Sequence, residues 1–221
     1  RAVPNKFPAL QVEGEFDRTG YGMYDMMSGI GAHEVIIECP EHDKTLTDVS
    51  IDQAELIFRA YRDRCVDLAK DNRFKYIMVF RNQGRVAGAS LEHAHSQLIA
   101  LPMVPRNVIE KLEGAARYFE FRERCAYCDM VKQEESYGER VVCSNDLFVA
   151  FCPFASKYPF ETWIAPKVHA RSFVDITKPE IKAFAKIVQE TLQRMAFCLP
   201  SSSYNFTLHT SPINQDIDRD F

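Results

Sequence analysis

Glu34-Val35-Ile36-Ile37-Glu38-Cys39-Pro40-Glu41-His42 is a β-branched run that ends in Pro-x-His. The stretch Glu161-Thr162-Trp163-Ile164-Ala165-Pro166-Lys167-Val168-His169 resembles it in the second half of the chain. In both copies an aspartate follows the histidine after six residues, at Asp48 and Asp175. A long helical stretch and a further strand-like run come next, and that run ends 40 residues after the histidine, near Asn82 and at His209. This matched spacing predicts two copies of one αβ unit.

Local patterns predict the elements within the two copies. β-Branched and aromatic runs predict strands at Glu34–Glu38, Tyr76–Phe80, Ser96–Ala100, Leu147–Phe151, Phe160–Ile164 and Tyr204–Leu208. Apolar periodicity predicts helices at Ile51 to about Asp71, Asn107–Phe121 and Lys178–Ala196. In the first helix we expect Leu56, Ala60 and Leu68 near one face. We expect Arg1–Leu10 and Glu13–Gly31 to be largely irregular, with a short strand near Ala9–Val12.

The two predicted units differ at their ends. The first, over residues 1–122, continues to His93-x-His95, eleven residues beyond Asn82. In the second, over residues 123–221, the matching place falls at Asp220-Phe221, where the given sequence ends. We therefore expect an α+β fold of two fused units, the second of them truncated.

Composition limits the classes of function. Of the 221 residues, 46% are hydrophobic and 26% charged, the net charge is −4, and no Lys/Arg block occurs, so we predict no nucleic-acid or membrane partner. The apolar runs are strand-sized, too short to cross a bilayer. The seven cysteines are odd in number and mostly scattered, which indicates a reducing compartment, and we predict a cytoplasmic protein.

His93-Ala94-His95-Ser96-Gln97 is the main candidate for catalysis. On an extended chain alternate residues share a face, so two imidazoles and an amide would lie together at the start of a strand. Imidazole is a good nucleophile toward phosphorus at neutral pH, and Gln97 would donate to a phosphoryl oxygen. Gly84, Gly88 and Ser90 just upstream would let backbone N–H groups approach phosphates. The alternative is a pair of half-buried histidines on a strand.

Cys125-Ala126-Tyr127-Cys128 has the spacing of half a tetrahedral zinc site. His169 is the natural third ligand, and the fourth is either His209 or a residue beyond the end of the sequence. Two ordinary cysteines flanking Tyr127 are the alternative.

His42 is the first-copy counterpart of His169, and it would bind a metal together with His93 if His169 does. No cysteine pair accompanies it in the first copy. His33 has no partner in the repeat, and we interpret it as a surface or structural residue.

These residues also carry a family resemblance. Asn82-Gln83-Gly84-x-x-x-Gly88-Ala89-Ser90-x-x-His93-x-His95-x-Gln97 is similar to the active-site segment of galactose-1-phosphate uridylyltransferases, which contain two fused copies of the histidine-triad fold. The opening Arg1–Leu10, Tyr158-Pro159-Phe160-Glu161 and His209-Thr210-Ser211-Pro212 also resemble that family. Particularly similar is the branch that includes plant ADP-glucose phosphorylase. The resemblance implies two histidine-triad-like units, each an antiparallel sheet with flanking helices.

The resemblance implies a role for each matching residue. His95 would attack the α-phosphorus of a nucleotide sugar, Gln97 and Ser90 would contact phosphoryl oxygens, and Asn5 and Asn82 would lie beside the nucleotide. His42 and His93 resemble zinc ligands whose cysteine partners would precede Arg1. Cys125, Cys128 and His169 resemble a second metal site whose last histidine would follow Phe221. Ala94 departs from many members, which have proline there.

The leading hypothesis is a UDP-glucose–hexose-1-phosphate uridylyltransferase of galactose metabolism. It would move UMP from UDP-glucose to galactose 1-phosphate in a ping-pong reaction, as a zinc-containing homodimer. An ADP-glucose phosphorylase, or a phosphorylase of a dinucleoside polyphosphate, is the alternative enzyme. A zinc-containing nucleotide-binding protein without activity is the third reading. Gln97 disfavours a hydrolase, since histidine-triad hydrolases usually carry a further histidine at that position.

Overall fold

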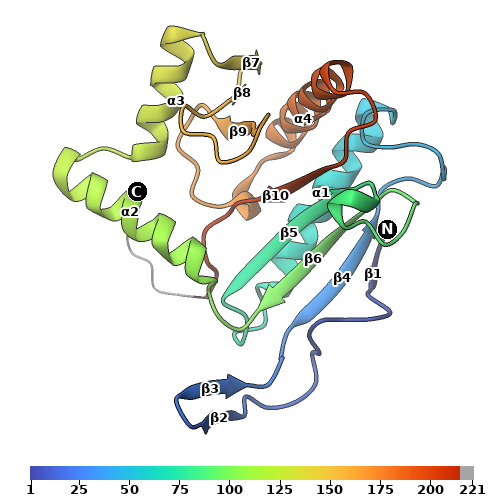
Figure 1. The fold of residues 1–221 in the computed structure, drawn as a ribbon, viewed down its shortest axis with the longest axis vertical. Coiled ribbons are helices and arrows are strands. Elements are labelled where there is room, and N and C mark those ends of the chain that lie inside the picture. Colours follow the sequence, from blue (N-terminus) through green and yellow to red (C-terminus); the bar gives the residue numbers. More distant parts are fainter. Residues whose placement is uncertain (215–221) are drawn as a thin grey trace.

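The computed structural model describes residues 1–214. Its largest sheet has five strands in the order β1 (Ala2–Pro4), β4 (Ala32–Ile37), β6 (His95–Leu101), β5 (Tyr76–Gln83) and β10 (Tyr204–Leu208). All neighbouring strands in this sheet run antiparallel (Figure 1). A turn of 3₁₀ helix, η1 (Arg85–Ala87), lies in the connection between β5 and β6.

Strand β10 belongs to the second half of the chain, yet it completes the sheet of the first half. It pairs with β5, so that Asn205 lies opposite Asn82 and Thr207 opposite Phe80. The two halves of the chain are therefore joined by backbone hydrogen bonds.

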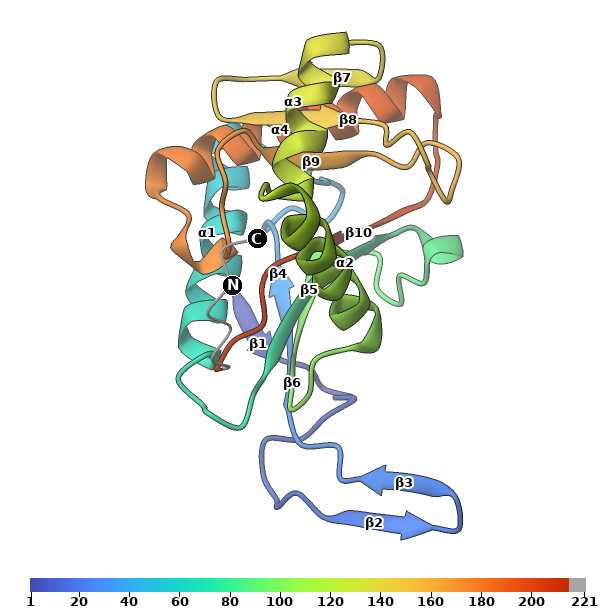
Figure 2. The same cartoon turned by 90° about the vertical axis from the view of Figure 1, so that its left-hand side faces the viewer.

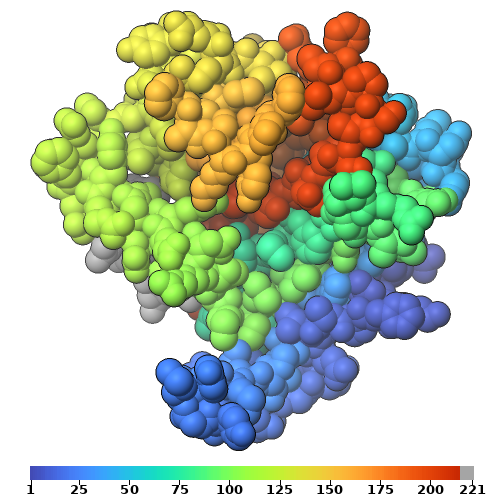
Figure 3. Space-filling model, in the orientation of Figure 1, coloured from blue at the N-terminus to red at the C-terminus, as the bar shows by residue number. Residues whose placement is uncertain are grey.

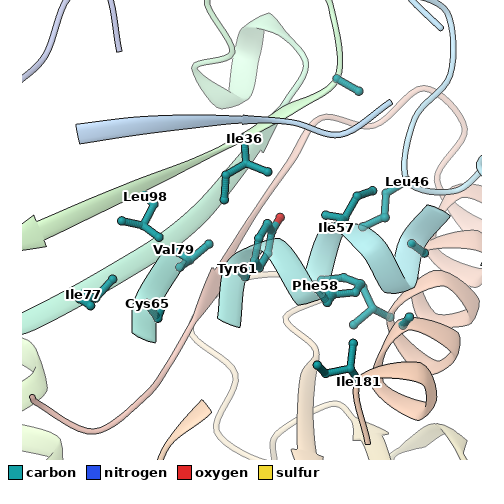
Figure 4. Packing of buried hydrophobic residues seen from close by; sticks show 14 of the residues in the cluster. Ile36, Leu46, Ile57, Phe58, Tyr61, Cys65, Ile77, Val79, Leu98 and Ile181 are labelled. Atoms are coloured by element: carbon teal, nitrogen blue, oxygen red, sulfur yellow. The ribbon is translucent and has the colours of Figure 1, made fainter. Parts of the chain in front are cut away.

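Helix α1 (Ile51–Leu68) covers one face of this sheet. Ser50 caps it, since its side chain accepts a hydrogen bond from the Gln53 amide at 3.2 Å. The buried stripe of α1 consists of Ala54, Glu55, Ile57, Phe58, Tyr61 and Cys65. Figure 4 shows Tyr61 of α1 facing Ile36 and Val79 of the sheet, while Phe58 lies on the side of α1 toward Ile181 of the last helix.

The expectation that Leu56 lies on the buried face of this helix was wrong, because Leu56 is 49% exposed. Ala60 and Leu68 are partly buried against the core, as expected. The buried stripe is therefore turned away from Leu56.

Apart from β10, which joins the large sheet, the elements of the second half lie mostly above that sheet in Figure 2, and its first helix extends down in front of it. The second half contains α2 (Arg106–Arg122), α3 (Ala126–Tyr137), a three-stranded antiparallel sheet of β7 (Val141–Ser144), β8 (Phe148–Phe151) and β9 (Trp163–Pro166), the 3₁₀ turn η2 (Phe173–Asp175), and α4 (Lys178–Cys198). Thr177 and Glu180 form a capping box at the start of α4. One face of α4, with Ile181, Ala185 and Val188, joins the core that α1 shares with the sheet.

Several expectations about local structure were wrong. The stretch expected to be irregular contains a hairpin of β2 (Arg18–Tyr21) and β3 (Tyr24–Met27), which stands out from the body in Figure 3. Near Ala9–Val12 the structure has only an isolated parallel bridge between Gln11 and Ile30. The strand expected from Phe160 begins at Trp163, because Phe160 adopts a left-handed turn conformation with φ of 61°.

The predicted fold class is confirmed as α+β with antiparallel sheets and flanking helices. The element order β4–α1–β5 recurs as β9–α4–β10. The place that would match His93-x-His95, Asp220-Phe221, lies outside the described residues. The boundary at residue 122 stays a prediction. Within residues 1–214, no helix is both long and apolar enough to cross a membrane.

Candidate functional site

The face of the large sheet that α1 leaves uncovered carries the candidate site. On β6, Ser96 points toward α1 and contacts the Tyr61 hydroxyl. His95 and Gln97 flank Ser96 and therefore project from the opposite face. The structure thus brings the His95 imidazole and the Gln97 amide together on the open face of a central strand, as the alternation of residues predicted. The second imidazole expected there, that of His93, was wrongly placed: His93 precedes β6, and its ring faces His42 and the Cys39 carbonyl instead.

His95 is held in one tautomer. Its side chain is 6% exposed, and its Nδ1 lies 2.9 Å from the backbone carbonyl oxygen of His93. A carbonyl oxygen only accepts hydrogen bonds, so Nδ1 carries the proton in this contact. In the neutral ring the lone pair is then on Nε2. The geometry therefore presents Nε2 as a nucleophile.

Gln97 contacts His33, a residue that we had interpreted as surface or structural. His33 lies on β4, is partly buried, and its Nε2 is 2.9 Å from Gln97 Oε1. The signal for this contact is the strand register, because Gln97 pairs with Val35, two residues from His33 on the same face. Register cannot be read from one sequence.

Asn5 follows β1 and lies beside this pair. Its Oδ1 accepts a hydrogen bond from the Phe7 amide at 2.9 Å, and its Nδ2 is 3.0 Å from His33 Nε2. The predicted nucleotide-binding residue Asn5 therefore shares one cluster with Gln97.

Asn82, at the end of β5, is oriented by a residue that sequence reasoning missed. Asn205 of β10 donates from its Nδ2 to Asn82 Oδ1 and to the Ala87 carbonyl, both at 2.7 Å. The contact ties the loop around η1 to the sheet. The pairing of β10 with β5 brings Asn205 opposite Asn82. The sequence repeat places these two strands in different units, so it gave no indication of this contact.

The loop from β5 to β6 holds the predicted phosphate-binding residues. Gly84 and Gly88 have φ of 85° and 87°, a region that side chains rarely enter. A Cβ at Gly84 would also overlap the Ser203 hydroxyl. Ser90 is exposed at the end of this loop. Both glycines are therefore required by the backbone path.

A buried polar network lies behind the site, and the sequence analysis did not anticipate it. Arg81 donates from Nε to both carboxylate oxygens of Glu38 at 2.8 and 3.0 Å, and from Nη1 to the Tyr204 hydroxyl at 2.7 Å. Ser96 donates to the same carboxylate and accepts from Tyr61. Burial raises the pKa of Tyr204 to about 12, so its hydroxyl stays protonated. The network fixes the backbone of β6 at the residue next to His95.

His42 and His93 place two imidazole nitrogens side by side. Their Nδ1 atoms are 3.2 Å apart, and His93 Nε2 donates to the Cys39 carbonyl at 2.8 Å. Zn–N bonds of 2.0–2.1 Å give a tetrahedral N–N edge of about 3.4 Å. The hydrogen bond to Cys39 also resembles the outer contact that orients a metal-binding histidine. The pair therefore fits two adjacent corners of a zinc site.

The second-half candidates also come together. One ligand atom from each of Cys125, Cys128 and His169 lies within 4.8 Å of the others. Cys128 Sγ is 3.3 Å from His169 Nδ1, close to the S–N edge of about 3.6 Å that zinc bond lengths give. Burial and the neighbouring Cys125 raise the pKa of Cys128 to about 11. In the described residues, His209 is not part of this group.

Two family models match this chain. The N-terminal domain of galactose-1-phosphate uridyl transferase matches residues 1–105, and the C-terminal domain of the same family matches residues 111–220. ADP-glucose phosphorylase of Arabidopsis thaliana is 36% identical over 96% of this chain and 60% of its own length. Galactose-1-phosphate uridylyltransferase of Thermotoga maritima is 32% identical over 84% of this chain and 58% of its own length.

A solved structure agrees with these matches. The crystal structure of an ADP-glucose phosphorylase from Arabidopsis thaliana with bound ADP-glucose has a TM-score of 0.87 at 33% identity, over 99% of this chain and 67% of that one. Fold and site thus define a two-unit α+β protein with its candidate nucleophile on an open sheet face. The chain belongs to the galactose-1-phosphate uridylyltransferase family. It spans about 60% of the length of the Arabidopsis phosphorylase and of the Thermotoga uridylyltransferase.

Proposed function

We propose that this chain carries the nucleophile of a nucleotidylyltransferase, which takes a nucleotidyl group from a nucleotide sugar and passes it to a phosphate acceptor. The observation that carries the proposal is the hydrogen bond from His95 Nδ1 to the His93 carbonyl, which leaves Nε2 with its lone pair. Membership of the family and the similarity to two kinds of nucleotide-sugar enzyme support the same reading.

The proposed reaction has two displacements at the α-phosphorus. Nε2 of His95 forms a P–N bond, and the bond from phosphorus to the bridging oxygen breaks with its electron pair, releasing a sugar 1-phosphate. A phosphate oxygen of the acceptor then attacks the same phosphorus, and the P–N electron pair returns to Nε2. While the adduct exists, the ring is positively charged, and the His93 carbonyl stabilises the Nδ1 proton. Gln97 would donate to the phosphoryl oxygens.

For the donor and acceptor we propose UDP-glucose and galactose 1-phosphate. The second candidate is phosphorolysis of ADP-glucose, which is favoured by the 36% identity to the Arabidopsis phosphorylase, against 32% to the Thermotoga uridylyltransferase. Both reactions begin with the same attack on the α-phosphorus of a nucleotide sugar, so the residues near His95 support the two candidates equally.

We propose zinc as the ion of both candidate sites, the His42–His93 pair and the group of Cys125, Cys128 and His169. The donor chemistry fits it, because thiolate sulfur and imidazole nitrogen are its usual ligands. Bound zinc would supply structural cross-links. His42 and His93 would hold the segment whose carbonyl orients His95, and Cys125, Cys128 and His169 would tie the start of α3 to the segment after β9.

A cytoplasmic homodimer is also part of the proposal. All seven cysteines are free, which is in keeping with a reducing compartment. Light scattering on the purified protein would test the dimer.

The test of the proposed function is the covalent adduct. The full-length protein is incubated separately with UDP-glucose and with ADP-glucose, and its intact mass is recorded beside that of His95→Ala. A uridylyl adduct that needs His95 and disappears with galactose 1-phosphate supports the first candidate. An adenylyl adduct discharged by inorganic phosphate supports the second. Nucleotide binding without any adduct would contradict the reaction.

A further inference from the structure

Gln97 is useful for phosphoryl transfer only if its amide nitrogen, rather than its oxygen, faces the phosphoryl group. A side-chain amide can turn over at little cost unless its surroundings distinguish the two ends. The contacts of His33 make that distinction.

The tautomer of His33 is set by the backbone. The amide of Ala9 lies 3.0 Å from His33 Nδ1, and a backbone N–H only donates. Nδ1 is therefore the acceptor nitrogen of the ring, and in the neutral imidazole the proton is on Nε2.

The protonated Nε2 selects the orientation of Gln97. It lies 2.9 Å from Gln97 Oε1, which accepts its proton. Turning the amide over would place two N–H donors against each other. Asn5 Oδ1 accepts from the Phe7 amide, so the group that Asn5 turns toward His33 Nε2, at 3.0 Å, is its amide nitrogen, which is a donor and does not accept the Nε2 proton. Gln97 Oε1 is therefore the acceptor for that proton. Among residues 1–214, none accepts a hydrogen bond from Gln97 Nε2, so its two N–H groups are free for a ligand.

We propose that His33 is a positioning residue for nucleotidyl transfer: it holds Gln97 with the amide N–H groups available to the phosphoryl oxygens at His95. The proposal rests on the proposed function. His33 is suited to this role because it lies on β4, paired with both β1 and β6, so its ring is held by the sheet. A chain of contacts then runs from the N-terminal loop through His33 to the reacting group.

The test compares two substitutions of similar size and polarity. In His33→Gln the terminal amide reaches the position of Nε2 and can still donate to Gln97. In His33→Asn the amide reaches only the position of Nδ1, so it can contact the Ala9 amide but not Gln97. The rate of nucleotidyl-His95 formation and the dissociation constant of the nucleotide sugar are measured by rapid quench in the full-length protein.

We expect His33→Asn to slow adduct formation by about 10- to 100-fold, as the loss of one transition-state donor does, with the dissociation constant changed by less than about threefold. His33→Gln should stay within about fivefold of the unmodified protein. If His33 acts through Gln97, the double variant His33→Asn/Gln97→Ala should be no slower than Gln97→Ala alone.

Other outcomes separate this proposal from the one that it rests on. If the unmodified protein forms the adduct and His33→Asn forms it equally fast, the positioning role is refuted while the proposed function stands. Multiplicative losses in the double variant would also refute it, because His33 would then act independently of Gln97. If the unmodified protein forms no adduct, both proposals fail.

Discussion

His95 and His93 are joined by a hydrogen bond of 2.9 Å from the ring of the first to the backbone carbonyl of the second. The ring of His93 points elsewhere, donating to Cys39 at 2.8 Å and facing His42. His93 therefore orients the candidate nucleophile with its backbone and joins a candidate metal site with its side chain.

The hydrogen bond predicts the behaviour of His95→Asn. The asparagine amide can still donate to the His93 carbonyl, but it has no nucleophilic nitrogen in place of Nε2. We expect nucleotidyl transfer to fall by about 10⁴-fold or more, with stability changed by about 1 kcal/mol. Adduct mass and urea unfolding on the same preparation check this. Transfer at more than a hundredth of the normal rate would identify another nucleophile.

Removing Cys125 and Cys128 should remove one metal ion. We expect about one to two equivalents of zinc in the full-length protein, and about one fewer in Cys125→Ser/Cys128→Ser. The double variant should also unfold at a lower temperature, because bound metal stabilises only the folded state. Metal analysis and calorimetry measure both effects. Cys198→Ser is the control, since that cysteine is exposed and outside the group. If both variants bind the same amount of zinc, Cys125 and Cys128 are not metal ligands and the prediction is wrong.

Asn205→Asp should weaken nucleotide binding although Asn205 belongs to the second half of the chain. A carboxylate cannot donate to Asn82 or to the Ala87 carbonyl, so the loop loses its tie to β10. The loss of about 1 kcal/mol would raise the dissociation constant of the nucleotide sugar about fivefold. Titration calorimetry measures it.

Asn214→Asp is the matched control for this experiment. Asn214 donates to three backbone carbonyls, those of Ala69, Asp71 and Phe74. Its substitution should lower stability and leave the dissociation constant unchanged. Equal weakening of binding by both variants would show a general effect on folding.

Arg81→Met should be among the most damaging substitutions to stability. Both members of the Arg81–Glu38 pair are buried, and the variant leaves the carboxylate without its charged partner. Breaking a buried pair in this way costs about 3–5 kcal/mol. Glu110→Gln is the control, because its pair with Arg106 is exposed at 59% and 91% and is worth about 0–1 kcal/mol. Urea unfolding measures the loss of stability in each variant. Similar losses in the two would contradict the burial of the Arg81–Glu38 pair.

The sequence predicted most of the regular structure because its signals are local. Strand runs, helix periodicity and the repeat that begins at Glu34 and Glu161 can all be recognised from the order of residues along the chain. The first helix shows the limit of that reasoning. Leu56 is apolar and still exposed, because the buried stripe was decided by packing against the sheet and α4.

The residues of the candidate site also fall into two groups, those that the sequence predicted and those that only the structure revealed. Motif spacing named His95, Gln97 and the Cys125 pair, and the structure places each in a geometry that suits its proposed role. The contact of His33 with Gln97 depends on the register of β4 and β6, and the contact of Asn205 with Asn82 depends on β10 of the second half pairing with β5. Neither strand register nor strand pairing between the two halves can be read from one sequence.

The pairing of β10 with β5 has a consequence for how the two copies of the repeat depend on each other. A fragment ending near residue 122 would expose the β5 edge and leave Arg81 without Tyr204. An unpaired strand edge invites association with other chains. The copy that carries the candidate nucleophile therefore needs a strand of the other copy to complete its sheet, so a substitution in β10 is also a substitution in the sheet of the first copy.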